Sequence, residues 1–62
     1  MPKVFIEMLE GRTIDQKRVM AEKVTDAMVA SLGVKRDAVL ITIRENKKEN
    51  LAKGGKLLMD LE

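Results

Sequence analysis

The sequence predicts an α+β protein built on one β-α-β unit, and three features of the chain lead to this prediction. Apolar residues alternate along residues 3–9, recur every three or four positions along residues 14–32, and form a β-branched run at residues 39–43. A strand, a long helix and a second strand in this order favour a parallel two-stranded sheet with a right-handed crossover. A chain of 62 residues has room for one domain, so we expect residues 1–62 to form it.

The first strand is predicted over residues 3–9 because its side chains alternate between two faces. The faces consist of Val4, Ile6 and Met8 on one side and of Lys3, Phe5, Glu7 and Leu9 on the other. Both faces contain large apolar residues, which indicates that both are covered in the working protein.

The long helix is predicted over residues 14–32. Thr13 fits the N-cap position, and Gln16 three residues later completes a capping box. Gly33 fits the left-handed position that ends a helix. The apolar stripe consists of Met20, Ala21, Val24, Ala27, Met28 and Leu32.

The second strand is predicted over residues 39–43, with a polar loop over residues 46–50. The strand faces consist of Val39, Ile41 and Ile43 and of Leu40, Thr42 and Arg44. Residues 51–62 carry Gly54-Gly55, a turn signal between short apolar stretches. We expect a small C-terminal hairpin or an arm that packs on a neighbour, or alternatively a final helical turn over residues 57–61.

The composition points to self-association. Cysteine and histidine are absent, so disulfides are impossible and metal sites of the usual kind are not expected. A domain this small usually needs such a staple or a partner. One helix covers one face of a two-stranded sheet, and a symmetric copy is the simplest cover for the other face. We therefore expect a dimer or a larger homo-oligomer.

Several classes of partner are not expected. The basic residues are interleaved with acids, the clusters Lys35-Arg36 and Lys47-Lys48 fit solvated turns, and aromatic residues at 2% offer no base-stacking platform for nucleic acid. No apolar run approaches the ~20 residues of a membrane span. No uncharged stretch typical of a signal peptide follows Met1, so a cytoplasmic location is expected.

Pro2 is the first candidate for chemistry, because it directly follows Met1. Proline is small, so removal of Met1 is expected in the cell and leaves a secondary amine that can act as a base or a nucleophile. Such an amine works as a base near neutral pH when burial or nearby cations lower its pKa. If Met1 stays attached, the Pro2 nitrogen is an amide and this chemistry is absent.

Arg12 is the second candidate, because it lies in the turn after the first strand. Pro2 and Arg12 then lie at opposite ends of that strand, so neighbouring subunits would have to bring them together. There, Arg12 would hold a substrate carboxylate in a planar two-point contact. Taken alone, both residues also have ordinary explanations, since proline after Met1 is common and an arginine in a turn is usually only solvent-exposed.

The whole chain resembles the 4-oxalocrotonate tautomerase family. The resemblance rests on chain length, Pro2, Met8-Leu9-Glu10-Gly11-Arg12-Thr13, Asp15-Gln16-Lys17 and Gly54-Gly55. It implies β-α-β subunits that form dimers and usually hexamers, as three dimers. It also implies that Pro2 is the general base, that Arg12 binds and polarises a substrate carboxylate, and that no metal or organic cofactor is needed.

The sequence departs from the family at two positions of the implied substrate site. The founding enzyme has a second arginine on the second strand, where this chain has Leu40. Its pocket phenylalanine corresponds to Leu51, which keeps the wall apolar. Arg44 shares the strand face of Leu40 but lies roughly 13 Å along the strand. Weaker candidates for the missing cation are Lys3, Lys48 and Lys53.

The resulting hypothesis is an enol–keto tautomerase acting on a 2-hydroxydienoate or a similar small enol acid. One alternative is a hydratase-type dehalogenase or decarboxylase, which needs a carboxylate to activate water, with Glu45 and Glu49 as the nearby acids. The other alternative is a non-catalytic oligomeric interaction protein, which the absence of an arginine at Leu40 favours.

Overall fold

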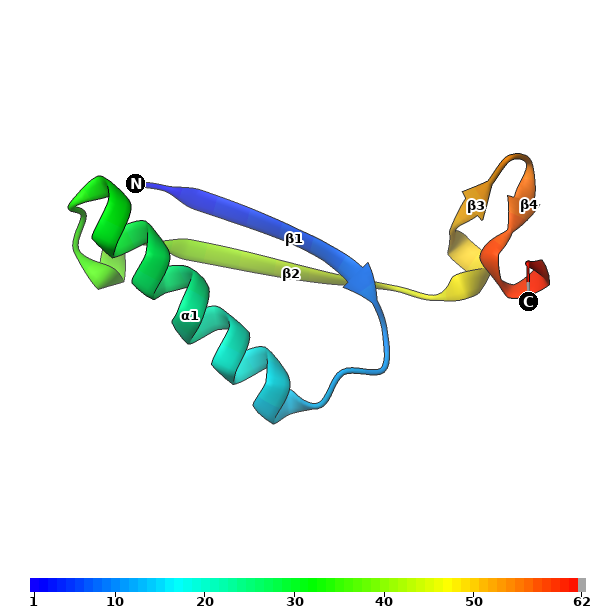
Figure 1. Cartoon of the computed structure of the whole chain (residues 1–62), viewed down its shortest axis with the longest axis horizontal. Helices are drawn as coiled ribbons and strands as arrows, with labels where there is room; N and C mark the ends of the chain where they lie inside the picture. The colour runs from blue at the N-terminus through cyan, green and yellow to red at the C-terminus, as the bar shows by residue number, and fades with distance from the viewer. Residues whose placement is uncertain (62) are drawn as a thin grey trace.

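The computed structural model of the chain describes residues 1–61 and contains the β-α-β unit expected from the sequence. Strand β1 (Lys3–Leu9) is followed by helix α1 (Ile14–Leu32) and strand β2 (Leu40–Asn46). The strands are parallel neighbours, and α1 crosses one face of them diagonally (Figure 1). The predicted fold class is therefore confirmed.

Strand β2 begins one residue later and ends three residues later than the sequence predicts. Val39 donates its N–H to the carbonyl of Arg36 at 3.2 Å and so closes the short 3-10 helix η1 (Arg36–Ala38) instead of joining the sheet. At the other end, pairing continues to Asn46 opposite Leu9. The N–H of Glu10 then donates to Asn46 at 3.0 Å and carries the ladder one step further.

Both predicted ends of α1 are confirmed. The Thr13 hydroxyl accepts from the Gln16 N–H at 3.1 Å, and the Gln16 side chain accepts from the Thr13 N–H at 3.0 Å. These reciprocal bonds satisfy two donors that a helix start leaves free. Gly33 ends the helix with φ 67°, a left-handed conformation that glycine adopts without steric cost.

The helix rests on the sheet along a strip that differs slightly from the predicted stripe. Four predicted residues are half-buried, but Ala27 is exposed and 57% of the Leu32 surface is accessible. Thr25 and Val29 are half-buried instead. Because the helix runs diagonally, the side that faces the narrow sheet shifts around the helix towards its end (Figure 1). The half-buried residues of the predicted stripe are Met20, Ala21, Val24 and Met28.

The C-terminal segment forms both structures that the sequence left open. After the 3-10 turn η2 (Lys48–Asn50), strands β3 (Ala52–Lys53) and β4 (Lys56–Leu57) make a small antiparallel hairpin. The 3-10 turn η3 (Leu58–Asp60) follows, and Leu58 donates back to the Leu51 carbonyl at 2.8 Å. The last residue of the predicted arm, Glu62, lies outside the described residues.

One face of the β1–β2 sheet is not covered by any other part of residues 1–61. Phe5 is 68% exposed and Leu40 is 51% exposed on this face, and no side chain among residues 1–61 is fully buried. The radius of gyration is 15.0 Å, whereas a compact domain of this length would have about 11 Å. An open sheet and an extended shape are typical of a subunit that completes its core with other copies.

Candidate active site

Pro2 lies at the start of β1, next to the start of β2. Its carbonyl accepts a hydrogen bond from the Leu40 N–H at 3.0 Å, and its ring is half-buried. Met1 is 83% exposed and precedes it, so the Pro2 nitrogen is an amide in this chain. Removing Met1 would turn this nitrogen into a secondary amine directly before β1.

Arg12 lies beyond the other end of β1, in the turn that leads to α1. Gly11 makes this turn possible with φ 115°, and Thr13 ends it by capping the helix. The Arg12 side chain is exposed at a pocket of about 180 Å³. This pocket is also lined by Met8, Gln16, Lys17 and Met20.

Leu51 lies at the same end of the molecule as Arg12. It is half-buried and borders an open pocket of about 300 Å³ together with Leu9 and Asn46, the last residues of the two strands. A larger depression of about 510 Å³ adjoins it between Gly11 and the residues of η2 and η3. Leu51 thus borders a pocket at the end of the sheet, and its role as the apolar wall of a substrate site stays a prediction.

The four candidate residues form two separate pairs. Pro2 and Leu40 are joined by a backbone hydrogen bond at one end of the sheet. Arg12 and Leu51 both lie beyond the other end, where they line different pockets. Strand β1 has seven residues, which corresponds to roughly 20 Å. A single chain therefore does not bring Pro2 and Arg12 together, as the strand length predicted.

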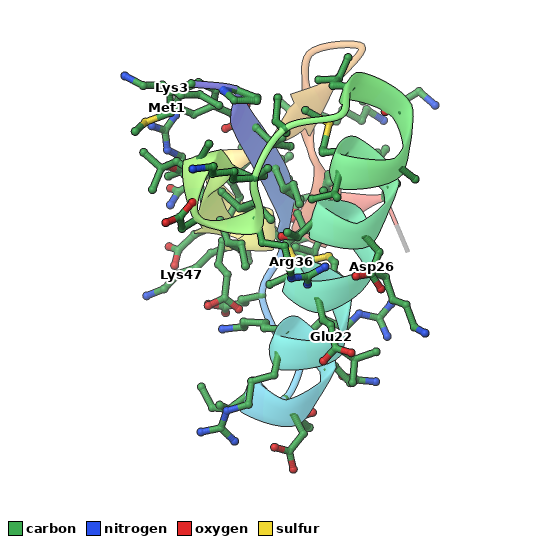
Figure 2. All side chains as sticks on the ribbon, turned by 90° about the vertical axis from the view of Figure 1, so that its left-hand side faces the viewer. Met1, Lys3, Glu22, Asp26, Arg36 and Lys47 are labelled. Atoms are coloured by element: carbon green, nitrogen blue, oxygen red, sulfur yellow. The ribbon has the colours of Figure 1, made fainter. Side chains whose placement is uncertain are left out.

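Cations near Leu40 were weighed as replacements for the missing arginine. Arg44 Nη1 lies 3.7 Å from Glu7 Oε1 across the strands, so this guanidinium already faces an acid. Lys3 pairs in register with Leu40 and lies with Met1 at the beginning of β1 (Figure 2). Lys48 and Lys53 follow β2 and lie at the far end. Of these cations, Lys3 is the one placed beside Leu40.

The two acids that could activate water both have basic neighbours. Glu45 Oε1 lies 2.5 Å from Lys17 Nζ, and Glu49 Oε1 lies 4.0 Å from Lys47 Nζ. The sequence analysis did not predict the contact between Lys17 and Glu45. The sequence does contain a signal for it, because Lys17 precedes the apolar stripe of the helix by one turn and Glu45 continues the alternation of Ile41 and Ile43. Both residues are therefore on the sides where helix and sheet face each other.

The described residues give no sign of a metal centre or a membrane span. Residues 1–61 contain no group of three or more His, Cys, Asp or Glu side chains that could hold a metal ion. No helix in the same range is long and apolar enough to cross a membrane.

The basic cluster at Lys35-Arg36 is partly neutralised by an acid. Arg36 Nη1 lies 2.5 Å from Asp26 Oδ1, and the two residues are neighbours in Figure 2.

Comparison with known proteins decides the family. The family model described as "Tautomerase enzyme" matches residues 2–61. The chain belongs to the tautomerase family. It is similar to a 2-hydroxymuconate tautomerase of Bacillus subtilis, with 44% identity over 62 residues and full coverage of both chains. A probable tautomerase of Bradyrhizobium diazoefficiens is 43% identical over 60 residues, which are 97% of this chain and 90% of the relative.

Solved tautomerase structures have the same fold. A crystal structure of a homologue of 4-oxalocrotonate tautomerase matches with a TM-score of 0.92 and 43% identity, over 98% of this chain and 100% of the other. A heterohexamer 4-oxalocrotonate tautomerase from Chloroflexus aurantiacus matches with a TM-score of 0.89 and 31% identity, over 100% of both chains. Membership of the tautomerase family supports an isomerase activity for this chain.

Proposed function

We propose that this protein is an enol–keto tautomerase that uses the Pro2 amine as general base after Met1 is removed. The amine takes the proton from the 2-hydroxyl of an enol acid, and the conjugated electrons shift so that a keto group forms. The protonated amine then returns the proton to a distal carbon of the same conjugated system. Bonds and charge balance within the substrate, so no metal or organic cofactor is required.

Arg12 has a different role in the proposed reaction. Its guanidinium holds the substrate carboxylate through two parallel hydrogen bonds. As the 2-hydroxyl loses its proton, the same positive charge also stabilises the negative charge that develops on the neighbouring 2-oxygen. Leu51 gives the pocket an apolar wall, and Leu40 contributes an uncharged contact beside Pro2.

The observation that carries the proposal is the separation of Pro2 and Arg12 at opposite ends of β1 in a chain of the tautomerase family. The two residues can act on one substrate when another copy contributes the second of them. We therefore propose a homo-oligomer, a hexamer of three dimers or a dimer, with sites shared between copies. The open sheet face and the heterohexamer described for the Chloroflexus aurantiacus relative support this assembly.

The substrate class follows from the cations of the site. Arg12 recognises one carboxylate, and Leu40 offers no charge for a second. Lys3 beside Leu40 is a point charge that lacks the two-point geometry of an arginine. A small enol acid with one carboxylate therefore fits best. The dicarboxylate to compare is 2-hydroxymuconate, because the Bacillus subtilis relative is named a 2-hydroxymuconate tautomerase.

A chain without cysteine also fits a cytoplasmic location, since small secreted domains usually rely on disulfides.

The proposal is tested by ketonisation of phenylenolpyruvate and 2-hydroxymuconate, followed by ultraviolet absorbance. Mass spectrometry first establishes that Met1 is absent from the sample. The wild type should ketonise phenylenolpyruvate well above the rate of a Pro2→Ala variant. Equal rates for both proteins on both substrates would favour the non-catalytic interaction protein. Turnover of a 3-haloacrylate without ketonisation would favour the hydratase-type alternative.

A further inference from the structure

We infer that the ion pair between Lys17 and Glu45 is a positioning element for Arg12, an inference that rests on the proposed function. Lys17 Nζ lies 2.5 Å from Glu45 Oε1, and the two side chains are only 21% and 34% exposed. The residues are 28 positions apart in sequence. Among residues 1–61, this is the one ion pair that joins α1 to the sheet.

Lys17 lies close to Arg12. Both side chains line the same pocket of about 180 Å³. The Lys17 N–H donates to the carbonyl of Thr13, the residue after Arg12, at 3.1 Å. Lys17 is thus fixed to the first turn of the helix, directly behind the turn that carries Arg12.

Glu45 fixes the other side of the same turn. It pairs in register with Met8, close to the end of β1. The next residue of β2, Asn46, accepts the hydrogen bond from Glu10 at 3.0 Å. The Lys17–Glu45 pair therefore connects the start of α1 to the end of the sheet. Gly11 and Arg12 form the turn between these two parts of the structure.

Apolar packing alone leaves this arrangement loosely determined. No side chain among residues 1–61 is fully buried, so within one copy α1 lacks the interlocking contacts that fix a helix angle in a dense core. Gly11, with φ 115°, gives the turn no stiffness of its own. An ion pair that is largely withdrawn from solvent is screened less than a surface pair, so it can define the approach of the helix start.

The orientation of Arg12 matters because a guanidinium binds a carboxylate through two parallel bonds in one plane. If the helix start shifts, Arg12 meets the carboxylate at a wrong angle and substrate binding weakens. Lys17 and Glu45 need no contact with the substrate for this effect. They are positioning residues and act through Arg12.

The test replaces Lys17 by methionine, which keeps the aliphatic stem and removes the charge. With phenylenolpyruvate as substrate, KM should rise about ten-fold, and kcat should fall less than in Arg12→Gln, because a misaligned Arg12 keeps its charge but loses its two-point contact with the carboxylate. Arg36→Met is the matched control. It removes the 2.5 Å ion pair with Asp26, which joins α1 to η1, and should leave KM unchanged.

A charge exchange separates positioning from general loss of stability. Glu45→Lys should raise KM as Lys17→Met does, and the double variant Lys17→Glu with Glu45→Lys should return KM close to wild type. If Lys17→Met or Glu45→Lys folds poorly, Glu45→Gln tests the same ion pair. The inference is overturned if Lys17→Met behaves like Arg36→Met, or if the double variant is no better than the single ones.

The proposed function can fail separately from this inference. If the wild type ketonises no faster than Pro2→Ala, the tautomerase proposal falls and the positioning role falls with it. If the wild type is active and Arg12→Gln raises KM but Lys17→Met does not, only the positioning role is wrong.

Discussion

The backbone N–H of Leu40 donates to the carbonyl of Pro2 at 3.0 Å, so an uncharged side chain stands directly beside the proposed base. The family resemblance leads us to expect an arginine at this position. The side chain is 51% exposed on the open sheet face of the single chain, so packing within one copy does not require leucine there. A preference for substrates with one carboxylate is the explanation that Leu40→Arg tests.

Leu40→Arg should create a site for a second carboxylate. A hydrogen bond to a charged group is worth about 1.5–3 kcal/mol, so KM for 2-hydroxymuconate should fall about ten-fold or more. KM for phenylenolpyruvate, which has one carboxylate, should stay the same. Ser31→Arg, on the exposed surface of α1, is the control for a new charge. An equal fall of KM for both substrates would show that the charge acts only from a distance.

Arg12→Gln should weaken both binding and turnover, because the amide keeps hydrogen-bonding capacity but lacks the charge. We expect kcat/KM for either substrate to fall about 10²-fold or more, as for loss of a donor that stabilises developing charge. Arg18→Gln is the control, since Arg18 is 73% exposed and pairs only with Asp15 within the helix. A similar loss in both variants would mean that Arg12 has no special place in the site.

Phe5→Glu should break the assembly, because it places a charge at the most exposed large apolar residue of the open sheet face, 68% accessible in the single chain. Burying an unpaired carboxylate between copies is strongly unfavourable. Sedimentation should show wild type as a dimer or larger, and this variant shifted towards the 7.0 kDa monomer. Glu22→Lys on the exposed surface of α1 should leave the mass unchanged. A wild type that sediments as a monomer at micromolar concentration would contradict the assembly.

Gly33→Ala should lower the stability of the fold without touching the site. Gly33 ends α1 at φ 67°, and a Cβ at this position meets no atom within 4 Å. The penalty is therefore purely conformational, about 1–2 kcal/mol for a left-handed residue with a side chain. Gly33→Asn should cost less, because asparagine tolerates this region. Thermal denaturation at a fixed protein concentration checks both, and equal midpoints for Gly33→Ala and wild type would contradict the role of the glycine.

Much of the fold could be predicted because its signals are local. Thr13, Gln16 and Gly33 mark the helix ends by their own side chains and conformations, and the alternation around Phe5 marks the first strand. The end of β2 could not be predicted in this way. Asn46 belongs to the strand because Leu9 pairs with it, and such pairing across the sheet leaves no mark in the polar sequence after Ile43.

One spatial relation of the candidate site could also be predicted. The length of β1 alone separates Pro2 from Arg12. The Lys17–Glu45 pair joins residues 28 positions apart, so it depends on how the helix lies on the sheet. Sequence reasoning considered Glu45 only as a possible activator of water, whereas the structure shows its carboxylate engaged by a lysine.

The central claim is that Pro2 of one copy and Arg12 of another act on the same substrate molecule, and mixed oligomers test it most directly. Pro2→Ala and Arg12→Gln chains are produced together, each with a different affinity tag, and oligomers that carry both tags are assayed with phenylenolpyruvate. A site shared between copies predicts recovery of about a quarter of the wild-type activity in a randomly mixed hexamer, or about a half in a dimer, because those shares of the sites pair an intact Pro2 with an intact Arg12. Activity no higher than the mean of the two separate variants would contradict a site built from two copies.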